Sequence, residues 1–351
     1  MKGYAVLGHN EAGWIEKERP VCGPMDSVLR PLAVSTCTSD VHWVEGPWIE
    51  RRRNLVLGHE GVGEIVEVGS LVKDFKVGDK VIIPAVTPNW SDVNSQAGYS
   101  AHSGGMLGGF SFAGKGGMFA DFFHVNDADG NLALLPDGMD LATASMISDM
   151  MPTGFHGVEL ADVQYGDTVC VIGIGPVGLM AVRGAVLRGA SRVFAVGTRP
   201  NCIQVAKEYG ATDFISYKDG ALDKQIFELT NKKGVDKVII AGGNNDTFIE
   251  AIKMAKPGGK IGNVNYLEDG DIIPIPRLAW GMGMAHKQIN GGLMIGGRHR
   301  MEKLISLVRY GRVDPSLLVT HRFEGLCAAE EMLDLMIKKP SDLIKTVTIV
   351  N

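Results

Sequence analysis

The chain has 351 residues, of which 45% are hydrophobic and 21% are charged, and its formal net charge at pH 7 is −5. This length exceeds what one hydrophobic core usually serves, so we expect two domains. The small negative charge excludes a protein that depends on a basic surface to bind nucleic acid or anionic lipid. The sequence contains no run of about 18 apolar residues, which excludes a membrane-spanning helix.

The cysteine pattern and the first residues of the sequence indicate in which cellular compartment the protein works. The five cysteines are Cys22, Cys37, Cys170, Cys202 and Cys327, an odd number without a C-x-x-C pair. This pattern favours neither a disulfide framework nor a cysteine-rich structural zinc site. The first twenty residues are mixed and polar, unlike a secretory signal segment. We therefore predict a cytoplasmic protein.

The first part of the chain has the pattern of β-structure. Short apolar runs separated by turns predict strands at 4–7, 27–34 and 55–57. Residues 62–86 have the pattern strand, turn, strand, which suggests a small β-barrel. Residues 87–118 are rich in glycine with little periodicity, which indicates a long functional or interfacial loop.

Four residues in this part of the chain carry metal-binding side chains. Cys37 opens the segment CTSDVH, and His59 and Glu60 follow the third predicted strand, so we expect these three residues on short turns. Asp149 lies in a helical pattern over residues 138–160, which we interpret as the joint between two domains. Thiolate, imidazole and carboxylate are the ligand types of catalytic zinc sites. The spacing alone fits a zinc site and ordinary packed or surface residues equally well.

The pattern at residues 168–199, TVCVIGIGPVGLMAVRGAVLRGASRVFAVGTR, predicts strand, tight turn, helix and strand. The turn has the spacing G-x-G-x-x-G in the context that a dinucleotide fingerprint requires. Gly173 makes the turn, Gly175 lets the backbone approach a pyrophosphate, and Gly178 brings helix and strand together. The phosphates then lie at the helix N-terminus, where N–H groups point outward. The predicted contacts are Gly173, Gly175, Pro176, Val177 and Gly178; the alternative is a turn with a structural role alone.

The end of the second strand of this unit distinguishes between NAD and NADP. NAD-binding folds usually place Asp or Glu there to bind the ribose hydroxyls, whereas this strand ends in Gly197, Thr198 and Arg199. Gly197 leaves room, Thr198 offers a hydroxyl, and Arg199 offers a guanidinium group to a 2′-phosphate. Tyr217, at the end of the next predicted strand, is placed to stack on the arginine or to contact the phosphate. We predict NADP(H) over NAD; the alternative is that Arg199 caps a solvated turn.

Helix and strand patterns alternate from the fingerprint to about residue 265, which predicts a doubly wound parallel sheet. The tail from Met294 contains helical patterns at 300–310 and 328–338 and a last strand at 346–350. We expect this tail to return to the first domain. The predicted domains are residues 1–152 with 294–351, and residues 153–293.

Motifs along the whole chain resemble those of one enzyme family, and they include CTSDVH, LGHEGVGEIVEVG, VGDKVIIPA, SDMMPTGFHGVELADV, GIGPVGLMAVRGA, MAHK and KPSDLIK. In these motifs the chain resembles the zinc-containing medium-chain alcohol dehydrogenases. More narrowly, it resembles the NADP-dependent secondary alcohol dehydrogenases of anaerobic bacteria and thermophiles. The resemblance implies an α/β protein with a Rossmann cofactor domain and a GroES-like β-barrel catalytic domain that binds zinc. It also implies a homotetramer.

The resemblance assigns roles to single residues. The implied zinc ligands are Cys37, His59 and Asp149, with Glu60 as an intermittent or fourth ligand. The implied catalytic residues are Ser39 and His42, which match a proton relay, and Thr38, which lies close to the nicotinamide. The 2′-phosphate site matches Gly197, Thr198, Arg199 and Tyr217, and further cofactor contacts match Val264, Asn265, Tyr266 and Lys339. From the residues alone, His42 as a surface histidine and Ser39 or Asp149 as helix caps remain alternatives.

The resemblance also implies a substrate pocket of Ala85, Phe110, Met150, Thr153, Leu293 and Met294. Phe110 stands where the family commonly has Trp, and Met294 stands where it commonly has Cys. One change enlarges the pocket and the other fills it. The four-cysteine lobe that binds a structural zinc in other alcohol dehydrogenases is missing, so we expect one catalytic zinc per subunit.

The predicted function is the reversible interconversion of small secondary alcohols and ketones, and also aldehydes, by hydride transfer with NADP(H). One alternative is a zinc-free NADPH-dependent enone or quinone reductase of the same superfamily, which the GHE turn and Cys37 disfavour. The other alternative is a non-catalytic NADPH-binding protein. A metal assay separates the first alternative from the predicted function, and a turnover assay separates the second.

Overall fold

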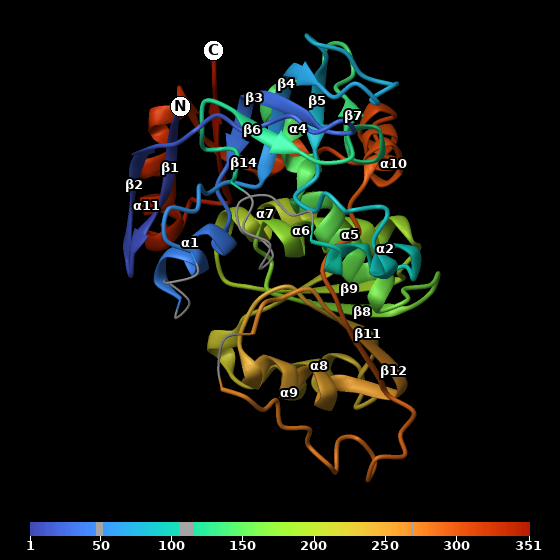
Figure 1. Ribbon diagram of the computed structural model, residues 1–351. Helices are drawn as coiled ribbons and strands as arrows, with labels where there is room; N and C mark the ends of the chain where they lie inside the picture. The colour runs from blue at the N-terminus through green and yellow to red at the C-terminus, as the bar shows by residue number, and fades with distance from the viewer. Residues whose placement is uncertain (47–51, 105–115, 268–269) are drawn as a thin grey trace. The chain divides into compact units, whose positions relative to one another are not determined.

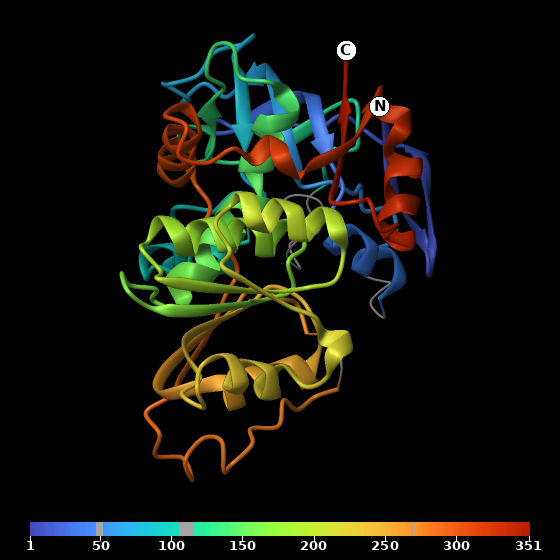
Figure 2. The same cartoon turned by 180° about the vertical axis from the view of Figure 1, so that it is seen from behind.

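The computed structural model describes residues 1–46, 52–104, 116–267 and 270–351. They form two compact units, one of Met1–Pro152 with Met294–Asn351 and one of Thr153–Leu293. The first unit therefore comes from both ends of the chain, and the second is one continuous segment (Figures 1 and 2). None of the described helices has the length and the apolar character that crossing a bilayer requires.

The first unit is built around a seven-stranded sheet with the order β14-β15-β3-β4-β5-β7, in which β6 also pairs with β3. Its strands are β3 (Ser27–Ser35), β4 (Glu60–Val68), β5 (Lys80–Ile83), β6 (Phe123–Val125), β7 (Ala133–Leu134), β14 (Val319–Glu324) and β15 (Lys345–Ile349). All neighbours are antiparallel except β14 and β15, which are parallel. A separate hairpin pairs β1 (Lys2–Gly8) with β2 (Glu11–Glu16).

Strand β3 is buried along almost its whole length because strands flank it on both sides. Its sequence SVLRPLAVS contains Pro31, which has no N–H to donate to a neighbouring strand. The register with β4 shifts between Pro31 and Ala33, and such an irregularity is where a central strand tolerates proline. The strand ends at Ser35, so its exit carries Cys37 into the buried interior.

Segment 38–45 corrects a sequence prediction. We predicted short turns in an all-β domain around Cys37, but residues Thr38–Glu45 form helix α1 with Cys37 as its N-cap. Only Val41 and Val44 supply buried apolar side chains, and two residues are too few to show a helical period. Glu60 is likewise the first residue of β4 and lies in no turn.

The other helices of the first unit agree better with their sequence patterns. The helical pattern at 138–160 is divided into α4 (Leu141–Ser148) and α5 (Met150–Leu160), with Asp149 between them. The tail contains α10 (Arg298–Arg309) and α11 (Ala329–Lys338), as predicted. Two short helices, α2 (Val93–Gln96) and α3 (Ala128–Asn131), complete the unit.

The second unit has a six-stranded parallel sheet with the order β10-β9-β8-β11-β12-β13. Its strands are β8 (Thr168–Ile172), β9 (Arg192–Val196), β10 (Asp213–Ile215), β11 (Val235–Ile240), β12 (Ala255–Asn263) and β13 (Gln288–Gly291). The chain moves outward from β8 in one direction and then from β11 in the other, which is the doubly wound order with a switch point between these two strands. The prediction of a Rossmann sheet is confirmed.

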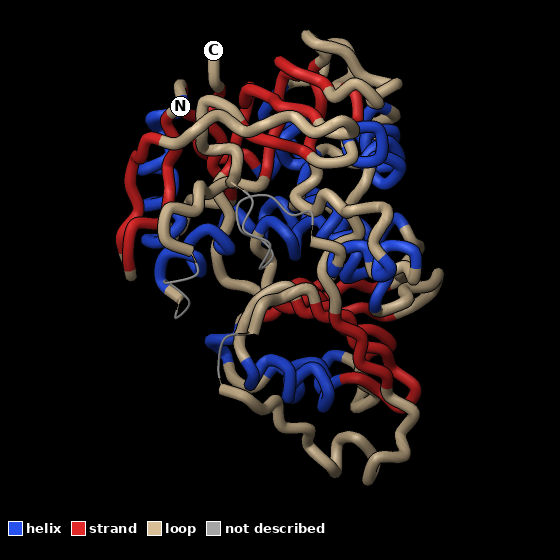
Figure 3. The backbone as a smooth tube through the Cα atoms, in the orientation of Figure 1, coloured by secondary structure: helices blue, strands red, loops and turns tan. Residues whose placement is uncertain are grey.

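Helices cover both faces of this sheet (Figures 1 and 3). One face carries α6 (Pro176–Leu187) and α7 (Pro200–Glu208), and the other carries α8 (Leu222–Leu229) and α9 (Asn245–Met254). The part of α5 from Thr153 onward packs closely on α6, because a Cβ atom at Gly154 would lie 2.5 Å from the carbonyl oxygen of Val177. Strands covered on both faces show the continuous apolar runs seen in β8 and β9.

Candidate metal centre and nucleotide site

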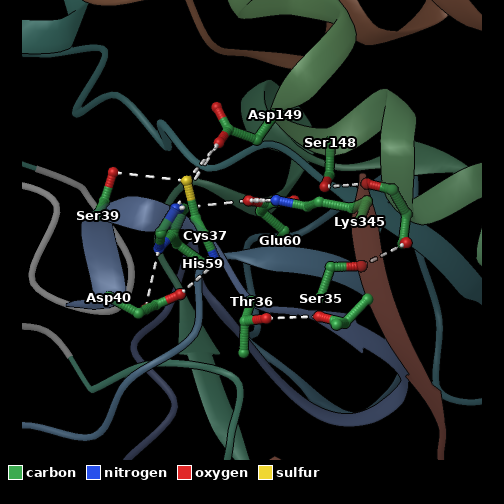
Figure 4. A network of polar contacts seen from close by, with 12 residues as sticks. Ser35, Thr36, Cys37, Ser39, Asp40, His59, Glu60, Ser148, Asp149 and Lys345 are labelled. Carbon is green, nitrogen blue, oxygen red and sulfur yellow. Dashed lines mark hydrogen bonds and ion pairs between the residues drawn. The ribbon is translucent and has the colours of Figure 1, made fainter. Parts of the chain in front are cut away.

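Four side chains converge inside the first unit: Cys37, His59, Glu60 and Asp149 (Figure 4). One ligand atom of each lies within 4.8 Å of one ligand atom of every other. Cys37 is the N-cap of α1, and His59 lies in the loop just before β4. Glu60 is the first residue of β4, and Asp149 lies at the junction of α4 with α5. Three segments distant in sequence thus meet at one point.

The spacing and chemistry of the cluster fit a metal ion. Oδ2 of Asp149 lies 3.7 Å from Nε2 of His59 and 3.9 Å from Sγ of Cys37. Zinc bonds of about 2.0–2.3 Å in a tetrahedron place neighbouring ligand atoms about 3.3–3.8 Å apart. Oε2 of Glu60 is buried and has no hydrogen-bond partner among the described residues. Thiolate, imidazole and carboxylate together are a zinc donor set.

The electrostatics of the cluster favour the metal-binding form of the cysteine. Burial raises the pKa of Cys37, but the charges of Lys345 and His59 outweigh burial and lower it overall. Burial lowers the pKa of His59, but the carboxylates of Asp40 and Asp149 raise it well above its usual range. A bound dication would oppose that rise, because it favours the neutral imidazole that binds metal.

Two residues that the sequence analysis missed hold the cluster in place. Asp40 is buried; its Oδ2 accepts a hydrogen bond from the Cys37 N–H at 2.8 Å, and its Oδ1 accepts one from the Gly58 N–H at 3.0 Å. Oδ1 also lies 3.5 Å from Nδ1 of His59. Lys345, from β15, donates to Oε1 of Glu60 at 2.7 Å. The position of Asp40 three residues after an N-cap could have indicated its role in the sequence, whereas no local pattern indicates a role for Lys345.

The predicted relay residues lie on one helix. Ser39 and His42 are three positions apart on α1, which places them on the same helix face. Oγ of Ser39 lies 3.6 Å from Sγ of Cys37, beside the cluster. Thr38 is the first residue of the helix, and the N-cap is Cys37, so Ser39 does not cap it. Arg52 donates to the carbonyl oxygen of His42 at 3.0 Å and stacks on Trp43, which anchors the end of α1.

Three of the predicted pocket residues belong to the first unit. Ala85 and Met294 share one small buried apolar cluster with Val86 and Ala101. The N–H of Ala85 donates to the carbonyl oxygen of Ser148 at 3.1 Å, next to Asp149 in the chain. Met150, which directly follows Asp149 in the sequence, is buried. Thr153 and Leu293 are the terminal residues of the second unit, and Phe110 lies outside the described residues.

The glycine fingerprint adopts the geometry that its spacing predicts. Gly173 has φ = +87°, a conformation that favours glycine, and a Cβ there would lie 2.7 Å from Cα of Gly242. A Cβ at Gly178 would lie 1.9 Å from the carbonyl oxygen of Gly173. Gly175 is the N-cap of α6, with Pro176 and Val177 in its first turn. The helix N-terminus therefore presents backbone N–H groups beside an open glycine.

The residues predicted at the 2′-phosphate site lie together at the ends of β9 and β10. A Cβ at Gly197 would lie 2.3 Å from Cγ1 of Ile174, so glycine is needed there. Oγ1 of Thr198 donates to the hydroxyl of Tyr217 at 3.0 Å. Arg199 is the N-cap of α7 but makes no side-chain capping hydrogen bond, and its Nη2 lies 3.7 Å from where a Cβ of Gly175 would be.

The remaining predicted cofactor contacts fall in both units. Val264 and Asn265 follow β12; the Val264 N–H donates to Ile240, and the Asn265 side chain donates to Gly243 at 2.9 Å. Tyr266 next to them is 62% exposed. Lys339 belongs to the first unit, where it ends α11 in the left-handed conformation with φ = +46°.

Comparison with known families matches the two halves of the chain. The model described as "Alcohol dehydrogenase GroES-like domain" matches residues 23–137, and the model described as "Zinc-binding dehydrogenase" matches residues 176–309. The first match covers most of the mixed sheet, and the second begins at Pro176, within the glycine fingerprint, and extends to the end of α10.

Similar proteins span the full chain. The NADP-dependent isopropanol dehydrogenase of Thermoanaerobacter brockii is 60% identical over 350 residues, covering 99% of this chain and 99% of its own. The enzyme of the same name from Entamoeba histolytica is 60% identical over 348 residues, covering 99% and 95%. Among solved structures, a zinc-dependent alcohol dehydrogenase from Streptococcus pneumonia in its apo form is 28% identical, with a TM-score of 0.89 over 100% of this chain and 99% of its own.

Proposed function

The chain belongs to the zinc-type alcohol dehydrogenase family, and from this premise we propose that it interconverts small secondary alcohols and ketones with NADP(H). The convergence of Cys37, which is half-buried, with the buried residues His59, Glu60 and Asp149 carries the proposal. Its relatives at 60% identity bear the name NADP-dependent isopropanol dehydrogenase. In this proposal Met1–Pro152 with Met294–Asn351 is the catalytic unit, and Thr153–Leu293 is the NADP(H)-binding unit.

Cys37, His59 and Asp149 would hold one zinc ion, with Glu60 as an intermittent or fourth ligand. A bound zinc ion supplies a Lewis acid that lowers the pKa of the substrate hydroxyl. This cluster is the proposed site of the catalytic zinc. Asp40 orients two of the ligands through the Cys37 N–H and the His59 ring.

Residues on α1 would move the proton of the alcohol. Oγ of Ser39 lies beside the cluster, where it can accept the substrate proton while its own hydroxyl proton passes to His42. Histidine suits this role because its unperturbed pKa lies within the physiological range. Thr38 would lie against the nicotinamide. Arg52 supports the relay by fixing the backbone of His42.

The second unit would bind NADP(H), which supplies the hydride acceptor or donor. Gly173, Gly175 and Gly178, with Pro176 and Val177, would place the pyrophosphate at the N-terminus of α6. Thr198, Arg199 and Tyr217 would bind the 2′-phosphate beside Gly197, because no carboxylate stands there to hold a free ribose hydroxyl. Val264, Asn265, Tyr266 and Lys339 are proposed as further contacts.

The proposed pocket is small and apolar. Ala85 and Met294 form buried apolar surface next to the segment that carries Asp149, and Met150 follows this ligand directly. Phe110, Thr153 and Leu293 are proposed to complete the pocket. This lining suits short alkyl groups on both sides of a carbinol carbon.

We also propose a homotetramer that works in the cytoplasm. Strand β13 is an edge of the parallel sheet, and an unpaired edge offers backbone groups to a second copy. The segment before it exposes large apolar side chains: Ile272, Ile275, Leu278, Met282 and Met284. All five cysteines are free of disulfides, as in a reducing compartment. Light scattering on a sizing column measures the assembly; a monomer would contradict it.

The decisive experiment follows NADPH formation from 2-butanol with the protein as isolated, after exhaustive chelation, and after zinc is restored. We expect activity that disappears with the chelator and returns with zinc. Activity that survives complete metal removal would contradict the zinc-dependent function and favour a zinc-free reductase. Absence of activity in all three samples, with zinc and NADPH bound, would favour a non-catalytic protein.

A further inference from the structure

Lys345 is a lysine inside the core of the catalytic unit. It is 1% exposed and lies at the start of β15, whereas lysine side chains normally reach solvent. Its Nζ atom lies 2.7 Å from Oε1 of Glu60, which is fully buried and 285 positions away in sequence. Figure 4 shows the ammonium group directed at this carboxylate, beside Cys37 and His59.

The charge of the cluster explains why a cation is needed there. Cys37 as thiolate, Glu60 and Asp149 carry three negative charges, and the buried Asp40 beside His59 adds a fourth, so a metal dication leaves negative charge uncompensated. A net charge buried in the interior is costly unless it is paired. Lys345 supplies positive charge there, with its Nζ atom 2.7 Å from Oε1 of Glu60.

The atoms involved show which role of Glu60 the lysine affects. Oε1, which Lys345 binds, is also the oxygen that lies 3.8 Å from Nε2 of His59 and so faces the cluster. The same oxygen cannot give its full electron density to a metal and to an ammonium group. The lysine and a bound ion therefore compete for Oε1, and because both oxygens belong to one planar carboxylate, the bond to Oε1 also fixes the direction of Oε2, which has no hydrogen-bond partner among the described residues.

The backbone beside Lys345 is fixed relative to the cluster. Oγ1 of Thr346 lies 2.5 Å from Oγ1 of Thr36, which directly precedes Cys37. Both hydroxyls are buried, so the contact ties β15 to the exit of β3. The backbone that carries the Lys345 ammonium group is thus fixed beside the cluster. Figure 4 shows the polar contacts of this region.

We propose that Lys345 is a positioning residue that holds Glu60 back from the metal, so that Cys37, His59 and Asp149 bind the ion and a position stays open for the substrate. The proposal rests on the proposed function only for what the open position serves. Catalytic zinc sites usually have three protein ligands, whereas sites with four are closed and structural. This cluster offers four candidate ligands, and Lys345 is the group that keeps Glu60 from binding the ion.

The test replaces Lys345 by Met, which has similar length and no charge. Without the ammonium group, the metal is the nearest cation to Glu60, and the carboxylate should join it. We expect zinc release to a chelator to slow by about tenfold or more, on the scale of changes next to metal ligands. We expect the visible bands of the cobalt-substituted variant to shift, because a carboxylate replaces the exchangeable group at the open position while the ion stays four-coordinate, and we expect kcat to fall more than tenfold.

A double-mutant cycle shows whether the effect passes through Glu60. In the Glu60→Gln background, Lys345→Met should leave the cobalt spectrum and the release rate within about twofold, because no carboxylate is present to close the site. Lys345→Arg retains the charge and should restore the wild-type spectrum. Lys287→Met is the matched control: this lysine of the other unit is 8% exposed and donates to the Ile252 carbonyl, so its loss should change neither readout.

Wild-type release and spectrum in Lys345→Met would overturn the proposal, and so would changes that persist in the Glu60→Gln background. If Lys345→Met does not fold, Lys345→Gln provides an uncharged donor with the same expectations. These readouts need no turnover. A wild-type protein that forms no NADPH from 2-butanol would refute the proposed function and would leave the role of Lys345 to be decided by the metal measurements alone.

Discussion

Asp40 and His59 form a buried pair in which Oδ1 of the carboxylate lies 3.5 Å from Nδ1 of the ring, while Nε2 of the same ring faces Glu60 and Asp149. The carboxylate therefore sits on the nitrogen that does not face the cluster. Such a contact fixes the orientation of a metal-binding histidine and raises its basicity.

The first prediction follows from this pair. Asp40→Asn keeps the size of the side chain but removes its charge, so zinc affinity should fall by about 10- to 100-fold. A competition titration with a chromogenic chelator measures this affinity. Asp162→Asn is the control, because that carboxylate binds Lys260 in the other unit. Equal zinc affinity in Asp40→Asn and wild type would show that the pair does not support the ligands.

The second prediction concerns cofactor choice. Arg199→Ala should raise the KM for NADP⁺ by about 10- to 100-fold, because a charge-assisted hydrogen bond contributes about 1.5–3 kcal/mol. The KM for NAD⁺, which has no 2′-phosphate, should change little. Steady-state kinetics with both cofactors measure the two values. Parallel increases in both would mean that Arg199 does not contact the 2′-phosphate.

The third prediction uses the backbone of Lys339. A non-glycine residue in the left-handed conformation costs about 1 kcal/mol, and glycine relieves this cost at a helix end. Lys339→Gly should therefore stabilise the protein by up to about 1 kcal/mol. It should also raise the KM for NADP⁺ if the lysine contacts the cofactor. Thermal unfolding measures the first effect, and a lower Tm than wild type would contradict it.

The fourth prediction concerns pH and lies far from the metal cluster. Nε and Nη2 of Arg192 bind the two carboxylate oxygens of Asp213, and this hydrogen bonding, opposed by burial, lowers the pKa of Asp213. A carboxylate whose pKa is lower in the folded state stabilises the fold above its unfolded pKa and loses this contribution as the pH falls through the folded value.

Asp213→Asn should accordingly lower the free energy of unfolding near pH 7 by about 1 kcal/mol or less, since both side chains are partly exposed and screened. The difference from wild type should shrink as the pH falls below about 4, where Asp becomes protonated in both states. Urea unfolding at several pH values measures it. A difference that stays constant with pH would show that the Asp213 charge is not responsible.

Local patterns made much of the second unit predictable. The glycines at 173, 175 and 178 encode a tight turn and close packing within six residues, and the alternation of strands and helices encodes the doubly wound order. The grouping of Arg199 and Tyr217 was predictable for the same reason, since each lies two or three residues after the end of a strand.

The first unit was predictable only in part, because its candidate site depends on contacts between distant segments. Helix α1 is short and buries two valines, which are too few to show a helical period in the sequence. Lys345 lies in a strand whose pattern gives no sign that a lysine is buried there, and Glu60, its partner, is 285 positions away. The resemblance supplied the proposed ligands, whereas Asp40 and Lys345, which contact them, came from the structure.

The split of the first unit has a consequence for how the chain is made on the ribosome. The segment Thr153–Leu293 leaves the exit tunnel whole and can fold while synthesis continues, because its sheet needs no later residue. Strand β3 pairs with β15, which is synthesised after the whole of Thr153–Leu293, so its sheet is completed later. A nascent chain arrested before β15 would already contain Cys37 and His59 but not the buried Lys345, so the first unit is completed after the second.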